Sequence, residues 1–155
     1  MKIERRDALK RKLAAIPKAA RAEIRKELAK QSADVVSTAR RFAPQKSGAL
    51  KKSIDYTFGE FKPDNANVRG VGGGGVGDPD LTVHIHAGDA KAYYAAFVEF
   101  GTAPHVQKDH PRFRNGHPGA AAHPFFFPAW RLGKKKAKAG VSRATRRAVK
   151  KALGK

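Results

Sequence analysis

The chain has 155 residues, 41% of them hydrophobic, which fits one domain with a modest core. Lys and Arg number 33 against 13 Asp and Glu, so self-repulsion at a net charge of +20 must be offset by a polyanionic partner, counterions or assembly. The absence of cysteine excludes disulfide bonds, a catalytic thiol and cysteine-ligated zinc.

The positive charge is concentrated at the two ends of the chain. Residues 1–52 hold sixteen Lys or Arg and five acids, residues 53–130 hold six and eight, and residues 131–155 hold eleven and none. The start of the chain shows no apolar core of a signal peptide, and no stretch approaches the ~20 apolar residues that cross a bilayer. We therefore expect a protein that is not exported by a signal peptide and has no membrane partner.

Apolar residues recur every three or four positions through the first 42 residues, which predicts helix. This stripe consists of Leu9, Leu13, Ile16, Ala20, Ile24, Leu28, Val35, Ala39 and Phe42. Because Pro17 lacks the amide that a helix interior needs, we divide the pattern into a short leading helix and a longer one that begins near Pro17 and ends by Pro44. Asp34, Arg40 and Arg41 lie off the stripe, where they are either solvated or bind a partner.

Two stretches of alternating polarity predict an antiparallel pair of strands. The inward residues are Ile54, Tyr56 and Phe58 in the first stretch and Leu81, Val83, Ile85 and Ala87 in the second, where Thr82, His84 and His86 point outward. Residues 62–80 include the glycine-rich run 70–77, which predicts a long loop without regular structure. This loop would connect the two strands as a hairpin.

The second half of the chain predicts a buried segment, an irregular excursion and a basic helix. Residues 92–101 form an apolar run that is either a short helix or a bent strand. Residues 103–124 carry four Pro and four His, so this excursion is either disordered or ordered by packing on something else. A last helical stripe consists of Phe127, Trp130, Ala137, Val141, Ala144 and Ala148.

These elements predict an α+β fold in which a long N-terminal helix packs on an antiparallel β-sheet. Long glycine-rich and Pro/His-rich loops and a basic C-terminal helix complete it. We expect a single α+β domain over residues 1–132 and a basic helical extension over residues 133–155.

No motif for catalysis, cofactor binding or metal binding is present. The glycine run ends in Gly77-Asp78-Pro79, whereas a phosphate-binding loop needs Gly-Lys-Ser or Gly-Lys-Thr. The histidines match no zinc spacing, and no Gly-x-Ser-x-Gly sequence marks a nucleophile. The six histidines are His84, His86, His105, His110, His117 and His123. We therefore predict no catalytic residue, no cofactor and no metal.

The all-basic C-terminal segment is the candidate surface for DNA or for an acidic partner. Its candidate contact residues are Lys134, Lys135, Lys136, Lys138, Arg143, Arg146, Arg147, Lys150 and Lys151. A merely solvated helix usually mixes both signs of charge, so the lack of acids favours contact with a polyanion. No aromatic residue follows Trp130, which argues against stacking on single-stranded bases.

Three segments, in this order, resemble a known family. Residues 39–54 read as a helix end followed by Ala-Pro, two residues, Ser-Gly, one residue, Leu, two basic residues and Ser-Ile. Residues 94–102 read Tyr-Ala-Ala-Phe-Val-Glu-Phe-Gly-Thr, and residues 123–129 read His-Pro-Phe-Phe-Phe-Pro-Ala. Together they are similar to the small tail-completion proteins of long-tailed bacteriophages. The motif residues are Pro44, Gly48, Leu50, Ser53, Tyr94, Glu99, Phe100, Gly101, Thr102, Pro124, Phe125 and Pro128.

Each motif has a structural role on physical grounds. Pro44 stops a helix, Gly48 permits a turn, and Glu99 caps or pairs within an apolar segment. Pro124 and Pro128 frame an aromatic plug, which consists of residues 125–127. None of these residues is a reaction centre.

The resemblance implies a non-enzymatic virion protein, made in the host cytoplasm, that joins the tail to the DNA-filled head. Such a neck or connector component would form a homo-oligomeric ring around the DNA channel, commonly of six copies. Its implied partners are adjacent neck or head-completion proteins, tail-tube or tail-terminator proteins, and packaged DNA through the basic ends. The alternative from charge alone is a non-specific nucleic-acid-binding protein of ribosomal or nucleoid type.

Overall fold

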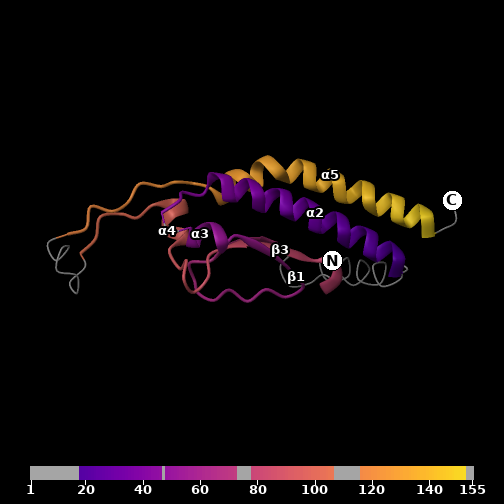
Figure 1. Ribbon diagram of the computed structural model, residues 1–155, viewed down its shortest axis with the longest axis horizontal. Coiled ribbons are helices and arrows are strands. Elements are labelled where there is room, and N and C mark those ends of the chain that lie inside the picture. Colours follow the sequence, from indigo (N-terminus) through magenta and orange to yellow (C-terminus); the bar gives the residue numbers. More distant parts are fainter. Residues whose placement is uncertain (1–17, 47, 73–77, 107–115, 153–155) are drawn as a thin grey trace, which may run out of the picture.

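A computed structural model describes residues 18–46, 48–72, 78–106 and 116–152. Its elements, in chain order, are α2 (Lys18–Phe42), α3 (Ala49–Lys52), β1 (Asp55–Phe58), β2 (Arg69–Gly72), the 3-10 helix η1 (Pro79–Leu81), β3 (Val83–Ala87), α4 (Ala95–Phe100) and α5 (Phe126–Ala152). The two long helices lie side by side and run in opposite directions, with the small sheet on one side of α2 (Figure 1). This arrangement confirms the predicted α+β class and the helix-on-sheet packing.

Helix α2 confirms the longer of the two helices predicted at the N-terminus. It begins directly after Pro17 and ends two residues before Pro44. The shorter helix predicted before Pro17 lies outside the described residues. Phe42 was expected in the buried stripe, but its side chain is 45% exposed, because the helix ends there and the next residue, Ala43, turns into the core.

The pair formed by α2 and α5 is packed through small side chains. Ala144 and Ala148 of α5 are buried, and Ala148 packs against Ala20 and Ile24 of α2. At the edges of this contact, Lys136 Nζ lies 2.7 Å from Asp34 Oδ2. The predicted C-terminal helix is therefore confirmed, with Ala148 packed against α2. The boundary predicted after residue 132 falls inside α5, and the division into two units stays a prediction.

The sheet has three antiparallel strands in the order β1-β3-β2. The predicted pairing of β1 with β3 is confirmed, with Tyr56 opposite Ile85. The prediction that residues 62–80 lack regular structure is wrong, because Arg69–Gly72 forms β2 on the other edge of β3. Local sequence disfavours a strand in this glycine-rich segment, but the free edge of β3 supplies backbone hydrogen-bond partners.

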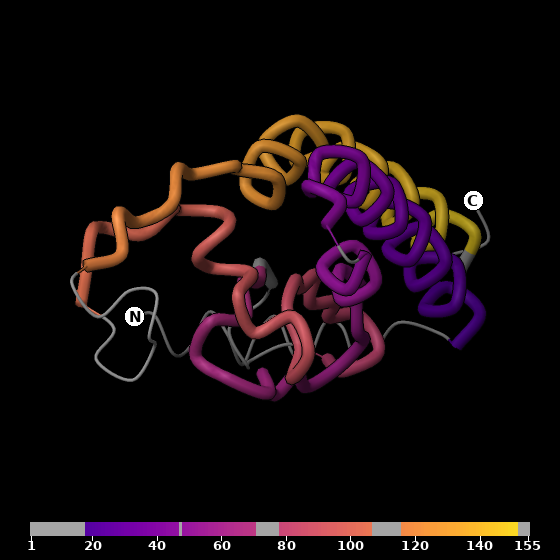
Figure 2. Tube along the Cα trace, turned by 60° about the vertical axis from the view of Figure 1, so that its left-hand side comes forward, coloured from indigo at the N-terminus to yellow at the C-terminus, as the bar shows by residue number. Residues whose placement is uncertain are grey.

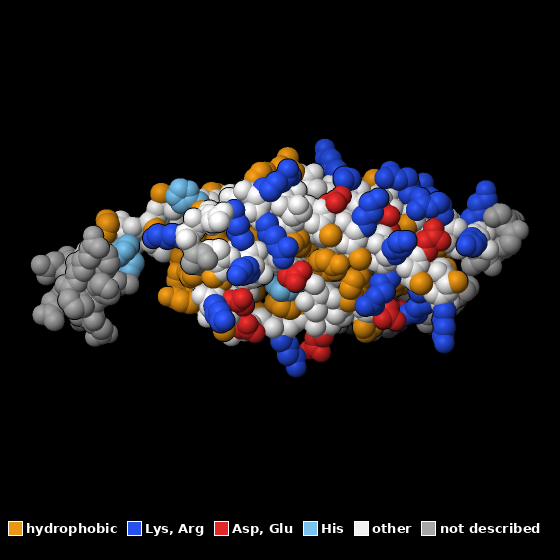
Figure 3. Space-filling model, viewed as in Figure 1, with side chains coloured by type: hydrophobic (Ala, Val, Ile, Leu, Met, Phe, Trp, Pro, Cys, Tyr) orange, Lys and Arg blue, Asp and Glu red, His pale blue; other side chains and the backbone are white. Residues whose placement is uncertain are grey.

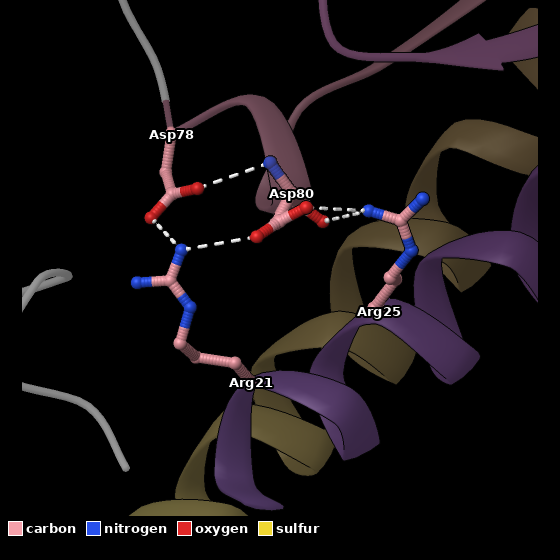
Figure 4. Close-up of polar contacts among 4 residues, drawn as sticks. All are labelled: Arg21, Arg25, Asp78 and Asp80. Atoms are coloured by element: carbon pink, nitrogen blue, oxygen red, sulfur yellow. Dashed lines mark hydrogen bonds and ion pairs between the residues drawn. The ribbon is translucent and has the colours of Figure 1, made fainter. Parts of the chain in front are cut away.

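A cluster of ion pairs fastens η1 to the start of α2 (Figure 4). Arg21 bonds to Asp78 and lies 3.4 Å from Asp80, and Arg25 Nη1 donates to Asp80 Oδ1 at 3.0 Å. Arg25 also lies over the ring of Phe58, 4.0 Å from its centroid. At the other end of α2, Arg40 donates from Nε to the carbonyl oxygens of Lys51 and Ile54. Charged side chains thus hold α2 on the sheet layer at both ends.

Of the two alternatives predicted for residues 92–101, a short helix and a bent strand, the structure has the short helix, α4. Beyond α4, two extended segments, residues 102–106 and 116–122, run antiparallel and are called the arm. Thr102 pairs with Ala120 and His105 with His117. The arm leaves the body at the end where α4 lies and stands away from both layers (Figures 1 and 2).

Candidate functional site

The motif residues of the first segment lie where α2 passes into α3 and β1. Gly48 has φ +78°, a left-handed conformation that favours glycine, so the predicted turn is present. Leu50 is buried in the core. Ser53 Oγ donates to the Leu50 carbonyl oxygen at 2.8 Å and accepts the N–H of Gly88 at 3.1 Å. Ser53 therefore ties the start of β1 to the end of β3.

Glu99 connects the second motif segment to the third. Its side chain is buried, and Oε2 accepts the backbone N–H groups of Phe125 at 2.8 Å and Phe126 at 2.9 Å. Oε1 accepts the N–H of Phe127 at 3.1 Å. At the start of a helix such N–H groups have no partner within the helix itself, and the helix dipole also favours a carboxylate there. The expectation that Glu99 caps or pairs is met by a cap whose partners lie 26 to 28 residues later in the chain.

The aromatic residues of the third segment belong to the core, with Phe127 partly buried against it. Phe125 and Phe126 are fully buried. Pro128 sits in the first turn of α5, where a missing N–H leaves no helical bond unmade. Pro124, directly before the buried Phe125, is exposed.

The remaining motif residues lie at the base of the arm. Tyr94 directly precedes α4, and its ring meets Tyr93 edge to face. Phe100 is exposed and its ring lies 5.9 Å from that of Phe127. Gly101 turns the chain out of α4, and Thr102 makes the first bridge of the arm. All three motif segments thus meet at one end of the molecule.

The nine basic candidates of α5 are all exposed. Lys136 pairs with Asp34, and Arg147 Nε lies 3.6 Å from Glu23 Oε1. For the other seven, the described part of the chain offers no acid within ion-pair distance. They are Lys134, Lys135, Lys138, Arg143, Arg146, Lys150 and Lys151. Lys and Arg side chains line the surface along α5 (Figure 3), so the predicted outward charge is present.

Comparison with protein families decides which proteins the chain is related to. The model of the HK97-gp10-like family, described as "Bacteriophage HK97-gp10, putative tail-component", matches residues 7–101, more than half of the chain. The chain belongs to this family. No curated protein and no solved structure matches it.

Membership of the HK97-gp10-like family makes the chain a bacteriophage tail component of the virion. The match contains the first motif segment and the second as far as Gly101. The arm, the aromatic plug and α5 follow after the matched residues. The buried Glu99 lies inside the match, and the α5 amides that it caps lie beyond it.

His86 departs from the expectation for an outward strand residue. Its ring stacks on Phe61 with centroids 4.1 Å apart, and its Nε2 lies 3.1 Å from Thr57 Oγ1. Nδ1 is buried without a hydrogen-bond partner. Burial lowers the pKa of His86 below its ordinary value of 6.5, against the opposing effect of Asp55. The loop after β1 places Phe61 over the His86 ring, so this outward strand residue is half-buried and not fully open to solvent.

Within the described ranges, no three His, Asp or Glu side chains gather closely enough to hold a metal ion. None of the helices in that part of the chain combines the length and apolarity that a membrane span requires.

An apolar hollow of about 370 Å³ lies between α2, α5 and β3, lined by Leu28, Val83, Ile85, Trp130 and Val141 among others.

Proposed function

We propose that this tail component is a tail-completion protein that joins the tail to the head at the neck of the virion. In this proposal it is a non-enzymatic part of a ring around the DNA channel, commonly of six copies. Its neighbours are neck or head-completion proteins and tail-tube or tail-terminator proteins. Family membership supports the tail assignment, and the three motif segments support the narrower role.

The observation that carries the proposal is the convergence of all three motif segments at one end of the fold. Residues from the end of α2, the end of α4 and the start of α5 meet there, and Glu99 bonds across two of these elements. The arm projects from the same end (Figure 1). In this proposal, the arm reaches neighbouring subunits.

Electron microscopy of a lysate from a producing strain that lacks this gene tests the proposal. We expect DNA-filled heads and free tails that remain separate. Supplying the intact gene from a plasmid should restore joined particles and controls for effects on neighbouring genes. Normal particles from the deletion strain would contradict the joining role.

A second candidate function, non-specific DNA binding, is favoured by the seven cations of α5 that have no acidic partner among the described residues. Contact with n phosphates releases counterions, so affinity falls steeply with salt. In a neck ring the same surface would face packaged DNA. In a free nucleic-acid-binding protein it would bind DNA as a monomer.

Fluorescence anisotropy with a labelled DNA duplex measures DNA affinity over a series of salt concentrations and distinguishes the neck ring from the free nucleic-acid-binding protein. Replacing Lys135, Arg146 and Lys150 by Gln should reduce the slope of log affinity against log salt by about 1 for each lost phosphate contact. Replacing Lys52, Lys62 and Lys91, which lie outside α5, by Gln is the matched control. Saturable binding by monomer near physiological salt would favour the free nucleic-acid-binding protein.

A further inference from the structure

The described surface of this highly charged chain contains one extended region without exposed ionised side chains. Residues 92–106 and 116–130 include a single Lys, Arg, Asp or Glu, which is Glu99, and that side chain is buried. Across the whole chain 30% of residues are charged. The region consists of the arm and the segment around α4 that carries it.

Aromatic side chains on this region face solvent. Tyr93, Phe97 and Phe100 are 56%, 42% and 59% exposed, and their spacing of four and three residues places them on one side of the α4 segment. Val106 on the arm is 60% exposed. Hydrophobic side chains gather at the base of the arm, around α4 (Figure 3). These three aromatic residues and the arm are called the uncharged surface.

The arm projects away from the described helices and sheet (Figures 1 and 2). Two pairs of backbone hydrogen bonds join the two segments of the arm, one between Thr102 and Ala120 and one between His105 and His117. At its base, the N–H of His123 donates to the carbonyl oxygen of Val98 at 2.8 Å. An isolated two-stranded ladder is marginally stable in water, so an arm of this kind gains most from an external surface. Exposed apolar patches next to it mark a protein contact.

We propose that the uncharged surface binds a second copy of this chain. Two chains of net charge +20 repel each other, so a contact between copies must use a region where no Lys or Arg comes between them. The described residues of the uncharged surface meet this requirement, with Arg69 at the margin, 5.8 Å from the Phe100 ring centroid. By sequence, the charges nearest to the arm are Lys108, Asp109, Arg112 and Arg114, which lie in the chain that links its two segments. Because the arm points away from its own body, the next copy receives it, which is the head-to-tail contact that closes rings.

This inference rests on the proposed ring and names the surface that forms it. The chain has no cysteine, so a single introduced cysteine is a unique attachment point. We would label Phe97→Cys and, as a control, Leu132→Cys with a benzophenone maleimide. Leu132 is an exposed apolar residue on α5, away from the uncharged surface, with 69% of its surface exposed. Illumination of each purified full-length protein is followed by a denaturing gel.

We expect covalent dimers and larger species from Phe97→Cys and only monomer from Leu132→Cys. Equal yields from both positions, or none from Phe97→Cys, would overturn the proposal. In sedimentation equilibrium, Phe97→Asp should weaken self-association by roughly tenfold or more, while Leu132→Asp should not change it. Far-UV circular dichroism checks that both variants keep their fold.

The outcome is separable from that of the deletion experiment. Separate heads and tails without Phe97 crosslinking would leave the joining role standing and reject this surface. Crosslinking at Phe97 with normal particles after gene deletion would support the surface and reject the joining role.

Discussion

Glu99 replaces a helix cap that the neighbouring sequence does not supply. The residues before α5 are His123, Pro124 and Phe125, none of which is a preferred N-cap residue. The buried carboxylate of Glu99 accepts three N–H groups instead. The start of α5 therefore depends on a residue from another helix.

We expect Glu99→Ala to lower the free energy of unfolding by about 3 kcal/mol or more, because it leaves buried N–H donors without an acceptor. Urea unfolding followed by circular dichroism measures this change. Glu60→Ala is the control, because that side chain is 82% exposed and its nearest cation, Lys62, lies 3.9 Å away. Its effect should stay within about 0.5 kcal/mol. Equal losses from both variants would argue against the cap.

Gly101 and Gly48 both have positive φ, but they differ in the space around them. A Cβ at Gly101 would lie 2.6 Å from the backbone oxygen of Ala120, whereas a Cβ at Gly48 would meet nothing within 4 Å. Gly48→Ala should therefore cost about 1 kcal/mol from backbone strain alone. Gly101→Ala adds a clash at the base of the arm and should cost about 2 kcal/mol more.

Hydrogen exchange at the amides of Thr102 and Ala120 reports this difference directly, because these amides make the first bridge of the arm. Gly101→Ala should speed their exchange, and Gly48→Ala should leave it unchanged. Unaltered exchange in Gly101→Ala would mean that the base of the arm adjusts without losing the bridge.

His86 makes stability depend on pH. Burial lowers the pKa of His86 in the folded chain. Below about pH 6.5 the imidazole therefore binds a proton more readily in the unfolded chain than in the folded chain, which favours unfolding. Stability should fall as the pH drops from 7 toward the lowered pKa. Asp55 and Asp64 oppose this effect, and His84 adds to it. In His86→Gln, the decrease in melting temperature over this pH range should be smaller, and an identical decrease would exclude His86 as its source.

At the scale of elements, the second half of α5 completes the packing of α2. Ala144 and Ala148 are buried, and Ala148 contacts Ala20 and Ile24. We expect deletion of residues 133–155 to expose Ile24 and to destabilise the chain by roughly 3 kcal/mol. Urea unfolding of both lengths measures this. Unchanged stability of residues 1–132 would support an independent domain that ends there.

Periodicity and proline positions were enough to predict the long helices and the pairing of β1 with β3. They missed β2, because the reason for that strand lies in the free edge of β3 and not in the glycine-rich residues themselves. The sequence also predicted a cap or pair for Glu99 but not the amides it bonds, since they follow the arm 26 residues later. The stacking of Phe61 on His86 depends on a loop path that no local pattern records.

At the scale of the whole molecule, charge is divided between two layers. α5 carries ten basic residues and no acid, while the sheet side mixes both signs. Repulsion along α5 and toward the basic residues of α2 opposes folding. Salt screens exposed charges over about 10 Å at 0.1 M, so this repulsion weakens as salt is added.

We therefore expect the melting temperature to rise when sodium chloride is increased from low to physiological concentration. The variant with Lys135, Arg146 and Lys150 replaced by Gln should start higher and rise less. Differential scanning fluorimetry at fixed pH measures both. A melting temperature that falls with salt would mean that the ion pairs at Asp78 and Asp80 outweigh the repulsion.

The two ends of the arm are anchored close together by one side chain. The arm leaves the body just after Glu99 and returns at Phe125, whose amide bonds to the same carboxylate. A force that pulls on the arm would therefore load this carboxylate from both directions, along with the bond between His123 and Val98. Glu99 makes the arm a closed mechanical loop, in which tension passes into the two helices α4 and α5 rather than into the sheet.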